Sequence, residues 1–101
     1  MVKIVWTELS IEDLKEIYDY ISLYSQRYAL ITIEKIYLRV QDIIDNPRVG
    51  RIVPEINNSK IREVISGSYR IVYKILSDTK VDILRVYHSA RLLKRTSFIK
   101  H

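Results

Sequence analysis

The residues best suited to chemistry lie close together in the second half of the chain, on three short runs of β-forming residues between positions 60 and 91. They are Arg62, Arg70, Arg85, His88 and Arg91. A guanidinium group binds two oxygens of a phosphate or carboxylate at once, and an imidazole gains or loses a proton near neutral pH. A sheet that presents these groups from neighbouring strands would suit a polyanion or a phosphodiester.

Charge is divided unevenly along the sequence. Residues 1–46 hold 5 Lys/Arg and 8 Asp/Glu, a net charge of −3, whereas residues 47–101 hold 12 and 4, a net charge of +8. Charge gathered in this way favours one basic working surface. Ordinary solubility charge is the alternative, but the basic residues fall on short strands and their connecting loops.

The absence of cysteine excludes several classes of site. A disulfide scaffold, a thiolate metal site and a thiol nucleophile are all ruled out, and we expect neither a metal nor a cofactor. No window of about 18 residues is continuously apolar, as a membrane-spanning helix would require. The N-terminus MVKIVWTE lacks the layout of a signal peptide. We therefore expect a cytoplasmic protein without membrane contact.

The elements that must position these residues begin with a strand and two helices. Residues 2–6 alternate as a short strand, after which Thr7 or Ser10 can cap an amphipathic helix. A second amphipathic helix is predicted from 26 to 45, and Pro47 ends it because proline disfavours helix at the preceding residue. Two helices joined by a short turn form an αα-hairpin. The length of 101 residues predicts one domain, 1–101.

The remaining elements are three strands, predicted at 61–65, 69–76 and 81–88. Their turns are too short for crossover helices, so an antiparallel meander is expected. We expect Val64, Val72, Leu84 and Val86 on one face, and Tyr69, Ile71, Tyr73 and Ile75 on the other. The fold class is therefore α+β, with the order β-α-α-β-β-β and the hairpin packed on the sheet. The tail from 89 to 101 is compatible either with a short basic helix or with a mobile segment.

Motifs along nearly the whole chain resemble the RelE/ParE superfamily of bacterial and archaeal toxins. They are Trp6, Asp13-Leu14-x-x-Ile17-x-x-Tyr20-Ile21, Asn46-Pro47, Gly50-Arg51-x-Val53-Pro54-Glu55, Arg62-Glu63, Tyr69-Arg70-Ile71-Val72-Tyr73 and Val86-Tyr87-His88-x-x-Arg91. None is specific alone, but their order and spacing together are. The resemblance implies the toxin of a type II toxin–antitoxin pair, with a cognate antitoxin as partner. Such antitoxins commonly have a disordered segment that folds on binding, and a groove beside the hairpin would receive it.

Superfamily members resembling RelE cleave mRNA on the ribosome, and the sequence offers candidates for that reaction. Glu55 would be the base and His88 the acid or base, while Arg62, Arg70 and Arg91 would hold the phosphate. Tyr73 or Tyr87 would stack on a nucleobase. Each residue also has a structural interpretation. His88 can simply end a strand, Glu55 can pair with a basic neighbour, and the tyrosines can belong to the core.

Members resembling ParE inhibit DNA gyrase instead, and this branch is favoured. Aligned on Tyr69-Arg70, the sequence has Ile61 and Glu63 where the RelE pattern has lysines, and Ser89 where it has an arginine. Some relatives cleave RNA with a Glu, Arg and His set, which keeps mRNA cleavage as the alternative. A toxin that has lost its potency and only binds antitoxin is a third hypothesis. The expected target-binding basic patch comprises Arg62, Arg70, Lys74, Arg91, Lys94 and Arg95.

Overall fold

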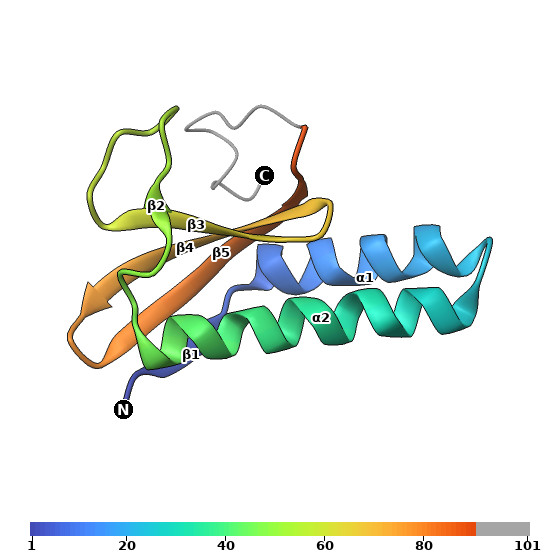
Figure 1. Ribbon diagram of the computed structural model, residues 1–101, viewed down its shortest axis with the longest axis horizontal. Helices are drawn as coiled ribbons and strands as arrows, with labels where there is room; N and C mark the ends of the chain where they lie inside the picture. Colours follow the sequence, from blue (N-terminus) through green and yellow to red (C-terminus); the bar gives the residue numbers. More distant parts are fainter. Residues whose placement is uncertain (91–101) are drawn as a thin grey trace.

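Seven elements follow one another along the chain in the computed structural model, which describes residues 1–90 (Figure 1). The helices are α1 (Glu8–Ser22) and α2 (Gln26–Asp45). The strands are β1 (Lys3–Trp6), β2 (Arg51–Ile52), β3 (Ile61–Ser66), β4 (Tyr69–Ser77) and β5 (Lys80–His88). The predicted α+β order is confirmed. The two-residue strand β2 was missed because it lies in a loop rich in turn residues.

The two helices begin and end where local chemistry dictates. Thr7 caps α1, since its hydroxyl accepts a hydrogen bond from the Ser10 amide at 3.2 Å. Ser25 caps α2 in the same way through the Tyr28 amide at 3.1 Å. The predicted range of α2 is confirmed, and Asn46 has the extended backbone expected before Pro47.

Within residues 1–90, five strands form one mixed sheet in the order β1-β5-β4-β3-β2. The predicted antiparallel meander of β3, β4 and β5 is confirmed. β1 joins it in parallel with β5, and the long connection that this parallel pairing requires includes the helical hairpin. Both helices lie on the same face of the sheet (Figure 1). We call this the helix face, and the opposite side the outer face.

Each face of the sheet carries its own apolar cluster. The helix-face core contains Val2, Ile36, Val40, Ile43, Val64, Ile71, Tyr73, Val81, Ile83 and Val86. A smaller outer-face cluster contains Val53, Ile56, Val72 and Tyr87. The predicted placement of Val64 and Val86 beside Val72 and Leu84 was wrong. Val64 pairs with Ile71, and a register shift at Val72 turns Val86 to the helix face.

Among residues 1–90, no helix is long and apolar enough to cross a membrane. The tail predicted as a short helix begins with Ser89 and Ala90, which form a turn, and continues outside the described residues.

Candidate functional site

Arg70 is the centre of an ion network on the outer face of the sheet. Its Nε donates to Oε1 of Glu63 at 2.9 Å, and its Nη2 contacts the same oxygen. Its Nη1 donates to Oε2 of Glu55 at 3.2 Å. Arg51 donates to the other oxygen of Glu63 at 2.7 Å. Arg70 is therefore held between two carboxylates, one of which it shares with a second arginine.

Strand alternation and a well-anchored loop create this network. Glu63 and Arg70 lie on neighbouring strands and point to the outer face, where both are buried. Glu55 comes from the loop between β2 and β3, which buried Val53 and Ile56 hold against the sheet. About a quarter of the Glu55 side chain stays exposed, at 24 %. The loop thus brings an accessible carboxylate to a buried arginine.

The charge state of Arg70 follows from these contacts. Burial alone would lower its pKa, but the hydrogen bonds and charges of Glu55 and Glu63 outweigh it and raise the pKa above the ordinary value. Arg70 is therefore a permanent cation. Its charge is already balanced by two carboxylates, which leaves it poorly suited to hold a further anion.

His88 lies on the other face of the sheet from Arg70. It pairs with Tyr69 across β4 and β5, and the two rings meet edge to face with centroids 5.9 Å apart. Arg70 pairs instead with Tyr87. Successive residues of a strand point to opposite faces. The structure therefore brings Glu55 and Arg70 together but separates both from His88, so the expected catalytic set does not converge.

The other residues of the expected basic patch are dispersed. Arg62 donates to the backbone carbonyls of Gly50 at 3.0 Å and Ser59 at 3.1 Å, so its guanidinium fastens the β2–β3 loop. Lys74 follows Arg70 on the outer face and is partly exposed. The remaining members, Arg91, Lys94 and Arg95, lie outside the described residues.

Both tyrosines proposed to stack on a base are buried, and the structure does not favour that role. Tyr73 is fully enclosed, donates to the Pro47 carbonyl at 2.6 Å and accepts from the Gly50 amide at 3.0 Å. Burial raises its pKa, although its hydrogen bond with Gly50 opposes this. Tyr87 is 3 % exposed, with the Arg85 guanidinium 4.5 Å from its ring centroid. Neither ring has a free face for a nucleobase.

An ion pair between α1 and β5 was not predicted from the sequence. The Asp13 carboxylate accepts from Arg85 at 2.8 and 2.9 Å and from the Val86 amide at 2.9 Å. Arg85, which the sequence suggested for polyanion binding, is thus engaged within the fold, and the hydrogen bond with Asp13 raises its pKa. The signal was present: Asp13 lies three and four residues from Ser10 and Ile17, on the buried stripe of the helix.

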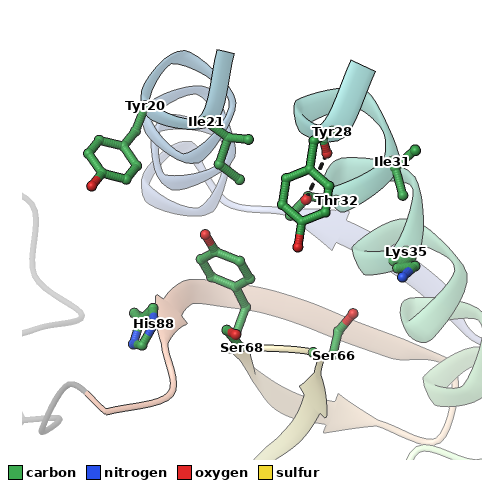
Figure 2. A pocket seen from close by; sticks show the side chains of 11 residues that line it. Tyr20, Ile21, Tyr28, Ile31, Thr32, Lys35, Ser66, Ser68 and His88 are labelled. Atoms are coloured by element: carbon green, nitrogen blue, oxygen red, sulfur yellow. Dashed lines mark hydrogen bonds between the residues drawn. The ribbon is translucent and has the colours of Figure 1, made fainter. Parts of the chain in front are cut away.

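A groove opens on the helix face beside His88, between the tip of the helical hairpin and the turn joining β3 to β4 (Figure 2). Its volume is about 330 Å³, and it is lined by Tyr20, Ile21, Tyr28, Ile31, Thr32, Lys35, Ser66, Gly67, Ser68, Tyr69 and His88. A second hollow continues past Tyr69 and His88 towards Glu16 on α1. His88 therefore belongs to a surface groove and not to the Arg70 network.

Comparison with known proteins identifies the family. The family described as "ParE toxin of type II toxin-antitoxin system, parDE" matches residues 4–93. The chain belongs to this toxin family. It is also 27 % identical over 92 residues to Toxin RelE2 of Caulobacter vibrioides, a match that covers 91 % of this chain and 100 % of that protein.

Solved structures of related complexes share the fold of this ParE-family toxin. One is the chromosomal ParDE system of P. aeruginosa, with a TM-score of 0.71, 22 % identity, and coverage of 87 % of this chain and 96 % of that one. Another is the RelBE2 toxin–antitoxin complex of Mycobacterium tuberculosis, with a TM-score of 0.57, 25 % identity, and coverage of 86 % and 96 %. Relatives named for both branches of the superfamily thus resemble this toxin.

Proposed function

We propose that this toxin acts by binding DNA gyrase and that a cognate antitoxin neutralises it. The observation that carries the proposal is the separation of His88 from Glu55 and Arg70. A metal-free cleavage of RNA needs a base, an acid and cations around one phosphate. A toxin whose candidate groups face opposite sides of a sheet is better suited to binding than to that reaction.

The electrostatics of Arg70 support the same conclusion. One well-placed donor in a transition state is worth about 3–4 kcal/mol. Here the Arg70 guanidinium already donates hydrogen bonds to Glu55 and Glu63. In addition, Ile61 and Glu63 occupy the positions where the RelE pattern has lysines. The positive charge available to a phosphorane is therefore small. A gyrase-binding role makes no such demand on Arg70.

Exposed apolar side chains support the antitoxin as partner. Around the hairpin tip, Tyr20, Leu23, Tyr24 and Tyr28 are between 59 % and 79 % exposed. Large apolar groups gathered on a soluble domain commonly mark a protein interface. The net charge of +5 would speed the capture of an acidic partner. An amphipathic antitoxin segment over the hairpin would cover these residues.

Ribosome-dependent mRNA cleavage is the second candidate. Two observations favour it: Glu55 and Arg70 are in contact, as a base and a phosphate-binding cation would be, and one relative is named Toxin RelE2. Under this alternative, binding to the ribosome would have to bring His88 to the same phosphate.

Inducible expression in bacteria tests the two candidates. If gyrase is the target, growth should stop with broken chromosomal DNA and intact mRNA, and His88→Ala should remain toxic because His88 performs no chemistry. mRNA cut on ribosomes, together with harmless His88→Ala, would replace the gyrase proposal by the nuclease. Unimpaired growth would instead support an antitoxin-binding protein without toxicity.

A further inference from the structure

The lysine Lys35 and several hydroxyl groups line the groove at the hairpin tip, and no acidic side chain stands among its described lining residues. Lys35 of α2 and His88 of β5 lie on opposite sides of it (Figure 2). Tyr28 and Tyr69 also line the groove. Ser66 and Ser68 add hydroxyls at the rim. Hydrogen-bond donors around a space without competing carboxylates suit an anion.

Tyr69 supplies the second observation. Its ring packs against the helix-face core, yet no hydrogen bond joins its hydroxyl to any other residue between 1 and 90. Burial and the neighbouring Tyr28 and Tyr20 raise its pKa, so the hydroxyl keeps its proton. A hydroxyl that bonds no other described residue is available to donate to a ligand oxygen in exchange for water.

The groove is preformed. Gly67, with φ at 57°, makes the tight turn between β3 and β4. The Ser89 amide donates to the Ser68 carbonyl at 2.7 Å and ties this turn to the end of β5. Across the groove, the Thr32 hydroxyl donates to the Tyr28 carbonyl at 2.8 Å. A rigid rim lowers the entropic cost of binding.

Apolar surface accompanies the donors. Ile21 and Ile31 form part of the wall, and the exposed Tyr20 and Tyr28 rings border it. A free inorganic anion would leave this surface uncovered. A carboxylate that reaches in from a chain carrying a bulky apolar neighbour would cover it.

We propose that this groove recognises an acidic side chain beside a large aliphatic residue on an amphipathic segment of the antitoxin. The carboxylate lies between Lys35 and the Tyr69 hydroxyl, and the aliphatic neighbour packs on Ile31 and the Tyr28 ring. The assignment rests on the proposed role of the antitoxin, because the partner must cover the hairpin tip. It adds the chemistry by which the toxin selects that segment.

The sign of charge along the surface also orients the segment. Beyond Tyr69 and His88, the second hollow is lined by Glu16 and by Asp13, which Arg85 already engages. A basic residue of the partner fits there, and its acidic residue fits near Lys35. The groove beside Lys35 would therefore bind the acidic end of the segment, and the hollow beside Glu16 would bind its basic end.

Nuclear magnetic resonance titration with two capped dipeptides tests the proposal without knowledge of the antitoxin sequence. Acetyl-Leu-Glu-amide and acetyl-Leu-Gln-amide differ only in the carboxylate. We expect both to shift the amide resonances of Ser66, Gly67, Ser68 and His88, with the glutamate peptide bound about three- to fivefold more tightly, as for one exposed ion pair. Equal affinities, or shifts confined to other residues, would overturn the proposal.

Matched variants locate the preference. Lys35→Gln and Tyr69→Phe should each reduce the preference for the glutamate peptide. Lys60→Gln removes the same charge at the opposite end of β3, outside the groove, and should preserve the preference. If Lys60→Gln weakens binding of the glutamate peptide as much as Lys35→Gln does, the net charge of the protein determines the affinity and the groove assignment is wrong.

A nucleotide is the competing ligand, and gyrase provides an independent readout. If uridine monophosphate displaces the glutamate peptide from the same amides with higher affinity, the groove binds nucleotides and the peptide assignment is wrong. Gyrase inhibition by Lys35→Gln is measured in parallel, where we expect it to match the unchanged protein. Failure of the unchanged protein to inhibit gyrase would overturn the proposed function but leave the peptide result intact.

Discussion

At the scale of single residues, Glu63 is a buried carboxylate whose charge two arginines share. Its side chain is 1 % exposed and joins Arg70 to Arg51. Glu63→Gln removes the buried carboxylate charge that Arg70 and Arg51 share, so we expect a loss of about 3–5 kcal/mol in the free energy of unfolding. Urea denaturation followed by circular dichroism measures it. A loss as small as that of Glu55→Gln, which we expect to be about 1 kcal/mol, would contradict this account.

Tyr73 makes the stability sensitive to alkaline pH. Its pKa is raised in the folded state above the ordinary 10.0, so the unfolded chain loses this proton first. The contribution to stability is fully present below about pH 10 and is lost as pH rises towards the folded pKa. Tyr73→Phe should flatten this part of the pH dependence and cost about 1–2 kcal/mol at neutral pH through its lost hydrogen bonds.

Exposed Tyr24 is the control for this effect, because Tyr24→Phe removes a phenol that is 79 % exposed. Thermal unfolding at several values of pH between 8 and 11, the range around the ordinary tyrosine pKa, provides the comparison. An unchanged alkaline slope in Tyr73→Phe would show that other groups cause the loss.

At the scale of elements, the contact between α1 and β5 depends on Asp13. Its carboxylate holds Arg85 and the Val86 amide where β5 extends beyond its pairing with β1. Asp13→Ala removes this carboxylate from the partly buried Arg85, and we expect a loss of about 3 kcal/mol or more in the free energy of unfolding. Amide hydrogen exchange should quicken at Val86. Exposed Asp19→Ala, on the same helix, should change neither quantity, and equal effects of the two variants would argue against this role.

Local patterns were sufficient to predict most of the elements. Proline at position 47 marks the end of α2, and the short turns define the meander. What the sequence could not give was strand register. The shift at Val72 reverses the face of Val86, and only the pairing itself reveals it. The pairing of β1 with β5 is also a long-range contact that local pattern does not encode.

The candidate site shows the same limit. The types of residue could be predicted, because Glu55, Arg70 and His88 lie in the motifs that resemble the toxin family. Whether Arg70 is a free cation depends on Glu63 and Glu55, which come from other segments. Successive residues of a strand point to opposite faces, so Arg70 and Tyr69 could be assigned to opposite faces from the sequence alone. The face of His88 depends on its pairing with Tyr69, which the sequence does not show.

At the scale of the whole molecule, gyrase inhibition should depend more on the basic C-terminal residues than on His88. Residues 91–101 include Arg91, Lys94, Arg95 and Lys100. We expect truncation after Ala90 to reduce inhibition strongly, because cations favour contact with a DNA-bound target. His88→Ala should retain nearly full inhibition. A truncated protein that inhibits gyrase as well as the full chain would show that the C-terminal residues are not needed for inhibition.

The most direct test of the gyrase proposal is a plasmid supercoiling assay with purified gyrase, ATP and this toxin. If gyrase is the target, supercoiling is inhibited, linear DNA accumulates after protease treatment, and His88→Ala acts like the unchanged protein. Normal supercoiling at all toxin concentrations, together with mRNA cut on translating ribosomes by the same preparation, would contradict the gyrase proposal and establish the nuclease instead.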